Sequence, residues 1–276
     1  LPLFVPDPNA TFARPPSGAN ARRGLRSRQM NMTPDENPVR RLGVIGDVHA
    51  EDARIEASLE ALESAGVDLI VCTGDVVDGT GSPDRSVELL RAANVLTVRG
   101  NHDRWLLEDR ARHVPDAHLA ASLAGHTQDY LHALPRELHV KTAGGPLLLC
   151  HGVGSADLRK VWPGSARMPP ERSRELDALL IEGDYKYLLN GHMHFRVVVH
   201  FVGMTMINAG TLRGGHSPGF MVLDFDEHHA EPYTFDTEDS GRITAAPPIT
   251  ILPRADHTVW RDTQEFNGAW EPTRLF

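Results

Sequence analysis

Two histidines stand one residue apart in the segment NGHMHF, residues 190–195, which lies between two apolar runs. Imidazole is among the commonest protein ligands of transition metals. Histidines at this spacing could hold one ion together, bind two different ions or have no role in metal binding. The segment alone leaves the three alternatives open, so the residues that gather around His192 and His194 in the fold decide between them.

Four other apolar runs end on residues of the same chemical kind. RLGVIG leads into Asp47 and His49, VDLIVCTG into Asp75, VLTVRG into Asn101, and LLLC into His151. A single Asp or His after a strand is most often a turn residue or a surface side chain. Here the same kind of group recurs at the same end of five runs, which chance would have to produce five times. We therefore interpret these residues as one metal-binding constellation.

The elements that must position these side chains alternate between strands and helices. Residues 41–99 read as strand, helix, strand, helix, strand, with apolar residues on one face of EDARIEASLEALESAG and a typical helix start at Ser82-Pro83. This order implies right-handed crossovers and a parallel sheet covered on both faces. Ligands of such sheets bind beyond the carboxyl ends of the strands, where the residues above are expected to meet.

The second half of the chain predicts another sheet. Residues 104–134 read as helical, ELHVKT and PLLLC as a hairpin across Gly144-Gly145, and a further helix is expected near 171–182. YKYLLN, RVVVHF, MTMIN and GFMVLDF leave no room for helices between them and favour a largely antiparallel second sheet. We therefore predict an α/β fold, a four-layer αββα sandwich of two mixed β-sheets flanked by helices.

The two ends of the chain differ from this central region. Residues 1–38, rich in Pro and Arg, are predicted as a flexible tail, residues 39–236 as the functional domain, and residues 237–276 as an extension that is packed on the domain or partly loose. No signal peptide is recognisable, and no apolar run approaches the roughly 20 residues that span a bilayer. The two cysteines end apolar runs and suit buried free thiols. We expect a cytoplasmic protein with no membrane partner.

The formal net charge of −9 bears on the partner. An acidic protein argues against a long groove for a nucleic-acid backbone, and no stripe of aromatic and basic residues supports a nuclease. A small phosphorylated substrate is compatible with this charge, because bound metal ions would reverse the local sign. The sequence leaves the oligomeric state open, with a homo-oligomer among the alternatives.

The candidate ligands are more numerous than one ion requires: Asp47, His49, Asp75, Asn101, His151, His192 and His194. Imidazole, carboxylate and amide donors without thiolate suit Mn, Fe, Zn or Co better than a structural zinc site. Two divalent or trivalent ions about 3.5–4 Å apart, sharing a carboxylate, would use the whole set, and this arrangement serves phosphoryl hydrolysis.

In this order GDVHA, GDVVD, GNHD, CHG and GHMH resemble the five signature blocks of the calcineurin-like metallophosphoesterases, over residues 41 to about 225. INAG, residues 207–210, and the strand after it are similar to the small bacterial and archaeal phosphodiesterase branch. The Ser/Thr protein phosphatases match less well, because Gly79-Thr80 and Asp103 replace their Arg-Gly and Glu. The resemblance implies the αββα sandwich and a hydrolase of a small phosphodiester or phosphomonoester.

The resemblance also divides the ligands between two ions. Asp47, His49, Asp75 and His194 would hold one, and Asp75, Asn101, His151 and His192 the other, with Asp75 bridging. A water shared by both ions would ionise near neutral pH, and the metal-bridging hydroxide would attack phosphorus in line.

Roles for the remaining residues follow from the same resemblance. His102 would protonate the leaving oxygen or stabilise the developing charge. Asp103 would either orient His102 or cap the following helix. Asp78 is expected to be a turn residue, and Arg99, at the end of a strand, could either clamp a phosphate oxygen or face solvent. Histidines outside the blocks, such as His118, are expected to be ordinary surface residues.

The alternative to an enzyme is a catalytically silent scaffold of the same fold that binds a partner protein, as a retromer subunit does. That subunit lacks the catalytic histidine, whereas His102 is present here with the full ligand set, so the hydrolase is the preferred prediction. Specificity is expected from segments outside the ligands. WPGSARMPP, residues 162–170, is either a rim loop or a plain solvent loop, and Trp260 or Trp270 either covers the crevice or anchors the C-terminal segment.

Overall fold

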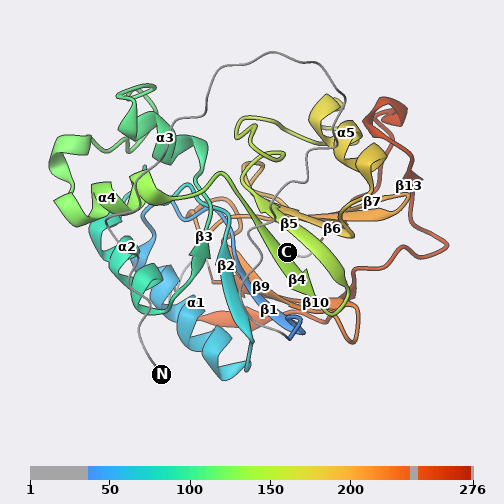
Figure 1. Cartoon of the computed structure of the whole chain (residues 1–276), viewed down its shortest axis with the longest axis horizontal. Helices are drawn as coiled ribbons and strands as arrows, with labels where there is room; N and C mark the ends of the chain where they lie inside the picture. Colours follow the sequence, from blue (N-terminus) through green and yellow to red (C-terminus); the bar gives the residue numbers. More distant parts are fainter. Residues whose placement is uncertain (1–36, 237–241, 275–276) are drawn as a thin grey trace, which may run out of the picture. The chain divides into compact units, whose positions relative to one another are not determined.

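The computed structural model describes residues 37–236 and 242–274. Within these residues the α/β fold is the predicted αββα sandwich, with two facing mixed sheets and helices on their outer sides (Figure 1). The predicted tail, residues 1–38, lies almost entirely outside the described residues. None of the helices in the described part of the chain is both long and apolar enough to cross a bilayer.

The first sheet begins with the three predicted parallel strands, β1 (Arg41–Ile45), β2 (Leu69–Cys72) and β3 (Leu96–Thr97). Helices α1 (Asp52–Ser64) and α2 (Pro83–Ala92) make the crossovers between them. Ser82 caps α2 as predicted, since its hydroxyl accepts a hydrogen bond from the Arg85 N–H (3.2 Å). On the other side of β1 lie the antiparallel strands β9 (Gly219–Asp224), β10 (His229–Phe235), β11 (Ile243–Ala245) and β12 (Ile249–Thr250).

The second sheet has the order β13, β7, β8, β6, β5, β4, with β14 also pairing with β7. Its strands are β4 (Glu137–Thr142), β5 (Gly145–Cys150), β6 (Tyr187–Asn190), β7 (Arg196–Phe201), β8 (Met204–Ala209), β13 (Val259–Trp260) and β14 (Thr273–Arg274). The predicted hairpin is confirmed as β4 and β5. The helices around the sheets also include α3 (Asn101–Leu107), α4 (Gly125–Ala133) and α5 (Arg174–Glu182).

The prediction of a largely antiparallel second sheet is wrong in two respects. Strands β5, β6 and β8 are mutually parallel, because α5 crosses between β5 and β6 and the β7–β8 hairpin places β7 on the far side of β8. GFMVLDF forms β9 and belongs to the first sheet. After β8 the chain changes sheets at Thr211, whose backbone bridges to Asp47 at the end of β1. A short loop can make this change because the two sheets face each other.

Three apolar layers hold the sandwich together. The inner faces of both sheets interdigitate through buried side chains such as Val44, Leu149 and Ile207. Helices α1, α2 and α4 cover the outer face of the first sheet, with Ile55 and Leu90 fully buried. Helix α5 and the segment after residue 250 cover the outer face of the second. Burial of this kind contributes about 25 cal/mol per Å² of apolar surface. The packed layers therefore hold the strands in place, and with them the residues that follow the strand ends.

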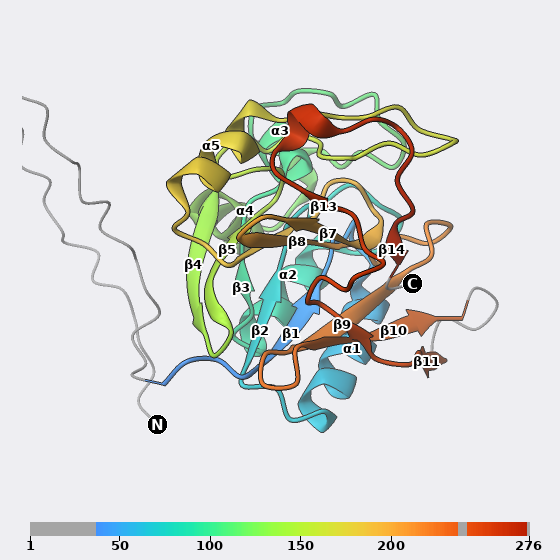
Figure 2. The same cartoon turned by 90° about the vertical axis from the view of Figure 1, so that its right-hand side faces the viewer.

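The C-terminal segment is part of both sheets in its described portion. Strands β11 and β12 extend the first sheet, and β13 and β14 both pair with β7 in the second (Figure 2). Trp260 and Trp270 are 6% and 5% exposed and pack in the layer with α5. Trp260 therefore anchors the segment, whereas Trp270 also contacts Trp162.

Candidate metal centre

The structure brings together all seven predicted ligands where strands of both sheets end. In one group, ligand atoms of Asp47, His49, Asp75 and His194 lie within 4.8 Å of one another. Next to it, His151 Nε2 lies 3.3 Å from Asp75 Oδ2 and 2.9 Å from Asn101 Oδ1. The ring of His192 lies 5.3 Å from that of His151. The residues thus form two neighbouring groups that share Asp75.

The first group presents two imidazole nitrogens and carboxylate oxygens to one point. His49 Nε2 lies 3.0 Å from His194 Nε2, which in turn lies 3.3 Å from Asp47 Oδ2. His49 Nδ1 is 2.9 Å from the Asp78 carbonyl, to which it can only donate, so its Nε2 keeps a free lone pair. A metal-ligating histidine commonly has its other nitrogen engaged in this way.

The second group also contains a histidine whose Nδ1 is engaged by a backbone carbonyl. His151 Nδ1 donates to the Thr73 carbonyl (2.8 Å), which leaves Nε2 directed at Asn101 and Asp75. His192 donates its backbone N–H to Asp47 Oδ2 (2.7 Å), while its ring lies beside His151. The neighbouring histidines of NGHMHF therefore belong to different groups. Nitrogen and oxygen donors of this kind fit Mn, Fe, Zn or Co.

The backbone at the site is held in an uncommon conformation. Five site residues have positive φ: His49 (50°), Asp75 (47°), Asp78 (67°), His192 (66°) and His194 (58°). Such a conformation costs about 1–3 kcal/mol per non-glycine residue and persists only where the surroundings enforce it. Its concentration here indicates that the fold, through the strand ends, fixes the direction of each ligand.

Glycines in the same segments allow the close approach of the carboxylates. A Cβ on Gly191 would overlap the Asp47 carboxylate and the Thr73 hydroxyl, and one on Gly100 would overlap the Asp75 carboxylate and backbone. The side chains could not move aside without leaving their ligand positions. The glycines before the Asn101 and His192 blocks are therefore required by packing.

The carboxylates and histidines of the cluster shift one another's pKa values. Burial alone would raise the pKa of Asp47 and Asp75, but His151 and the other histidines around them together outweigh it, and both pKa values are lowered. Burial would lower the pKa of His151, but the two carboxylates raise it to about 10. Burial lowers the pKa of His49 and of His192 to about 4. Near neutral pH, His151 is therefore the one of these three histidines that must lose a proton before it can bind a cation.

His102 is oriented by Asp78, which changes the expected role of that aspartate. The Asp78 carboxylate is fully buried and accepts a hydrogen bond from His102 Nδ1 (2.8 Å). Arg112 donates to both of its oxygens (2.9 and 3.0 Å). Burial would lower the pKa of His102, but the hydrogen bond to Asp78 and the charges of the nearby carboxylates together outweigh it, and the pKa is raised. Asp78 lies in a turn, as predicted, and in addition forms a hydrogen-bonded dyad with His102.

Asp103 does not orient His102, and it is not itself the N-cap, since it is the third residue of α3; its side chain satisfies the N-cap backbone instead. Its carboxylate accepts the N–H of Gly100 (2.9 Å), the N-cap residue of α3, and the N–H of Val76 (2.7 Å). It faces the backbone rather than the His102 ring, so the orienting role passes to Asp78. Burial and the charge of Asp75 raise the pKa of Asp103 to about 7.

His118 and Arg99 lie close to the site and differ in how their side chains are bound. His118 is not an ordinary surface residue, because its Nδ1 accepts the Asp78 N–H (3.1 Å) and its own N–H donates to Asp78 Oδ1 (2.9 Å). Arg99 lies next to Gly100 and is partly buried, and its side chain has no hydrogen bond or ion pair within residues 37–236 and 242–274. The phosphate clamp at Arg99 stays a prediction.

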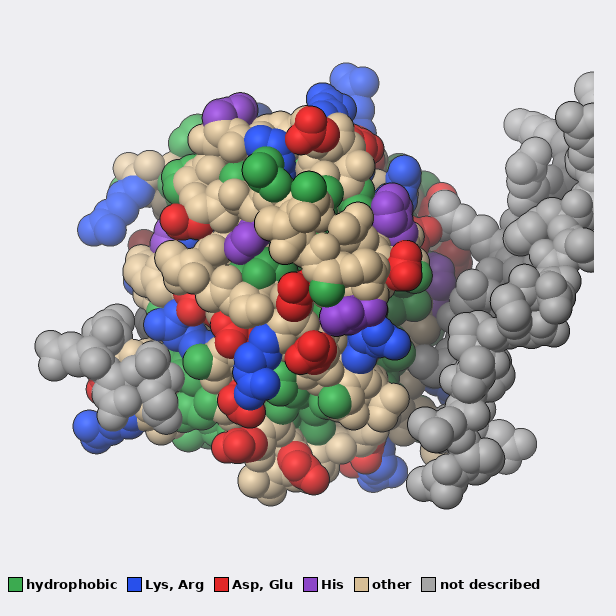
Figure 3. Space-filling view, turned by 90° about the vertical axis from the view of Figure 1, so that its left-hand side faces the viewer, with side chains coloured by type: hydrophobic (Ala, Val, Ile, Leu, Met, Phe, Trp, Pro, Cys, Tyr) green, Lys and Arg blue, Asp and Glu red, His purple; other side chains and the backbone are tan. Residues whose placement is uncertain are grey.

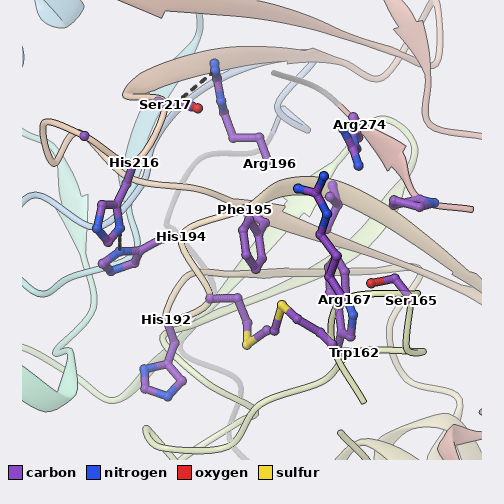
Figure 4. Close-up of a pocket in the computed structure, with 15 residues that line it drawn as sticks. Trp162, Ser165, Arg167, His192, His194, Phe195, Arg196, His216, Ser217 and Arg274 are labelled. Atoms are coloured by element: carbon purple, nitrogen blue, oxygen red, sulfur yellow. Dashed lines mark hydrogen bonds between the residues drawn. The ribbon is translucent and has the colours of Figure 1, made fainter. Parts of the chain in front are cut away.

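Sequence reasoning missed Arg112 and His216. His216 Nδ1 lies 2.9 Å from His194 Nδ1, so the two rings share a hydrogen bond behind the first ligand group (Figure 4). His216 follows no strand end, and the only local signal is its place in RGGHSPG after the last block. Arg112 lies in the connection between α3 and α4, where nothing in the sequence marks it.

A second acidic cluster differs from the metal centre because an arginine already lies within it. Asp224, His229 and Glu231 lie close enough to hold an ion. Arg41 already lies among them, 2.5 Å from Asp224 and 3.1 Å from Glu231. Its charge neutralises the carboxylates, so this cluster is a structural ion-pair network on the first sheet.

Comparisons with known proteins give the family of the chain. Residues 41–228 match the family model described as the calcineurin-like phosphoesterase superfamily domain. A 66-residue stretch is 38% identical to the uncharacterized protein MJ0912 of Methanocaldococcus jannaschii and covers 24% of this chain. The match spans only 27% of that relative's length.

Solved structures with a similar fold come from several organisms. The hypothetical protein PH1004 of Pyrococcus horikoshii has a TM-score of 0.53 at 16% identity, over 75% of this chain and 86% of that one. YfcE, a phosphoesterase from E. coli, gives 0.46 at 19% identity, over 77% of this chain and 100% of that one. Vps29 of Entamoeba histolytica complexed with zinc gives 0.47 at 18% identity, over 77% and 99%. At these identities the likeness concerns the fold.

Replacement of His216 by Ala should weaken metal binding about 10- to 100-fold, because partners that orient a ligating histidine typically have effects of this size. Isothermal titration with Mn²⁺ measures the affinity. His113→Ala, an exposed histidine outside the site, is the matched control and should bind as the unmodified protein does. Equal affinities for the two variants would contradict the role of His216.

Metal affinity should increase with pH by about tenfold per unit between pH 7 and 9, because one proton must leave His151 when an ion binds. The sign follows from the raised pKa of about 10, since at lower pH the bound proton competes more strongly with the cation. Titration in buffers of different ionisation enthalpy counts the protons released. An affinity that does not change over this range would contradict the assignment of His151.

Proposed function

Because the chain belongs to the calcineurin-like phosphoesterase superfamily, we propose that it is a dinuclear metal-dependent hydrolase of a small phosphodiester or phosphomonoester. The observation that carries the proposal is the pair of four-residue ligand groups joined at Asp75. Seven nitrogen and oxygen donors suit two ions of Mn, Fe, Zn or Co. Cys72 and Cys150 are buried, free and outside both groups.

The metal ions and His102 would have different roles in hydrolysis. Two ions at this position would neutralise charge on a phosphate ester and lower the pKa of a water between them. His102 stands beside the first group, with its ring 5.0 Å from that of His49. Its Nδ1 is engaged by Asp78, so Nε2 is the nitrogen from which a proton can pass to the leaving oxygen.

Asp78 and Arg112 act on the reaction through His102. The carboxylate fixes the orientation of the imidazole and stabilises its protonated form, as in other carboxylate–histidine pairs. Arg112 in turn supplies a positive charge that keeps Asp78 ionised: burial would raise the pKa of Asp78, but the bonds to His102 and Arg112 lower it. Asp78 and Arg112 are therefore positioning residues in the proposed mechanism.

A small substrate is supported by the distribution of charge. Acidic and basic side chains are interspersed on the face of the molecule shown in Figure 3, with no broad basic surface there for a polynucleotide backbone. The net charge of −9 acts in the same direction. We therefore propose a small phosphorylated partner rather than a nucleic acid. The buried free thiols suit a reducing compartment such as the cytoplasm.

Asp75→Asn should reduce hydrolysis of bis(4-nitrophenyl) phosphate and 4-nitrophenyl phosphate in the presence of Mn²⁺ by about 1,000-fold or more, because the shared ligand loses its charge. Release of 4-nitrophenolate measures the rate. Asp184→Asn, at an exposed position after α5, is the control and should keep full activity. Unchanged turnover in Asp75→Asn would contradict the mechanism. Stoichiometric metal without esterase activity in the unmodified protein would favour the silent scaffold.

His102→Ala should keep its metal content and lose the most activity on esters with poor leaving groups, because these most need a proton. We expect about 100-fold slowing with a phenyl ester and about tenfold or less with a 4-nitrophenyl ester. Asp78→Asn should show the same order with smaller effects. Equal slowing of both esters would remove His102 from the role of proton donor.

A further inference from the structure

A cavity of about 710 Å³ opens directly beside His192 and His194. Four segments distant in sequence build its wall: residues 192–197 after β6, the loop from Trp162 to Met168, residues 215–217, and the C-terminal residues Pro272 and Arg274 at β14. WPGSARMPP is thus a rim loop rather than a plain solvent loop. A volume of this size is typical of a pocket for a molecule as large as a nucleotide.

One part of the wall is aromatic and apolar. Phe195 is 41% exposed, and its ring lies 5.3 Å from that of Trp162. Trp162 is almost fully buried and is held from behind by Trp270, with the two rings nearly perpendicular. Met168 and Met193 also line the cavity. This arrangement leaves a supported aromatic surface available to a planar group of a ligand.

Another part of the wall is cationic. Arg167 and Arg274 are exposed, and neither guanidinium forms an ion pair or hydrogen bond within the described ranges, residues 37–236 and 242–274. In Figure 4 both lie on the side of Phe195 that is opposite His194 and His216.

Arg196 lines the same cavity but differs from these two arginines. It is buried and donates to the carbonyl of Tyr233 (2.5 Å) and to the Thr234 hydroxyl (3.0 Å), so it serves the fold. The side chains of Arg167 and Arg274 have no such structural partners. In a protein with a net charge of −9, two unengaged guanidinium groups at one pocket favour the binding of an anion.

We propose that this pocket binds the non-reacting part of the substrate, and that this part contains an aromatic ring and a second anionic group such as a further phosphate. The ring would stack on Phe195, which Trp162 supports, and Arg167 and Arg274 would bind the anion. The inference rests on the proposed function, because the reacting phosphate would lie at the metal centre next to His192 and His194. The substrate class is therefore an aromatic phosphoester with a second negative charge, of the size of a nucleotide.

Three diesters with the same leaving group test the proposal on the full-length, Mn²⁺-loaded protein. They are methyl 4-nitrophenyl phosphate, thymidine 5′-(4-nitrophenyl phosphate) and the 3′-phosphate of the latter. We expect kcat/KM to rise about tenfold with the thymidine group, from stacking, and about tenfold again with the 3′-phosphate, from the arginines. Release of 4-nitrophenolate measures all three reactions.

Variants assign each gain to its part of the wall. Phe195→Ala should reduce the thymidine-to-methyl ratio of kcat/KM about tenfold, and the milder Phe195→Leu should reduce it less. Arg167→Ala combined with Arg274→Ala should reduce the ratio between the 3′-phosphate and the parent thymidine ester by about tenfold. Arg254→Ala is the control, because Arg254 pairs with Asp256 outside the pocket, and both ratios should stay as in the unmodified protein.

The possible results distinguish a failure of the proposed function from a failure of the proposed substrate class. No 4-nitrophenolate from any of the three diesters or from 4-nitrophenyl phosphate would overturn the proposed function and the pocket with it. Hydrolysis of 4-nitrophenyl phosphate alone would overturn the substrate class and leave the proposed function. Hydrolysis of all three with equal kcat/KM would overturn the substrate class alone. Gains that persist in the Phe195 and arginine variants would show that another surface recognises the ring and the anion.

Discussion

The two buried carboxylates of Asp47 and Asp75 are the constraint on which the rest of the site depends. They are 0% and 1% exposed and belong to one cluster at the ends of β1 and β2. Ionised groups in such a place cost several kcal/mol each unless cations compensate them. Protonated His151 supplies positive charge in the metal-free site, and bound metal ions would replace that proton and compensate both carboxylates. The left-handed turns and the glycines that approach these carboxylates fix both groups where the cations must lie.

Much of the architecture and the ligand set could be predicted from sequence, since each ligand directly follows an apolar strand and parallel strands end at one edge. The path of GFMVLDF could not, because an apolar run fits either of two facing sheets. The His102–Asp78 pairing could not either. Asp78 lies in a loop and Asp103 in the first turn of α3, and only the direction of their side chains shows that Asp78 meets His102 while Asp103 accepts the N–H of Gly100. His216 and Arg112 act through contacts from loops, where no periodicity marks them.

The metal ligands and much of the pocket wall come from different segments of the chain. The ligands come from strand ends that the core of the sandwich holds in place. The pocket beside them is lined by residues 192–197 and, in addition, by the loop at residues 162–168, by residues 215–217 and by β14, which the C-terminal segment adds to the second sheet. Loops and added strands can vary without disturbing the core. The C-terminal segment thus contributes Arg274 to the pocket, and Trp270 supports the aromatic wall.

The NGHMHF segment holds the central claim, that its two histidines serve different ions. A crystal grown with Mn²⁺ and measured for anomalous scattering tests this claim directly. The account predicts two peaks about 3.5–4 Å apart, the spacing of two-metal sites, with His194 at one, His192 at the other and Asp75 at both. A single peak ligated by both His192 and His194 would contradict it.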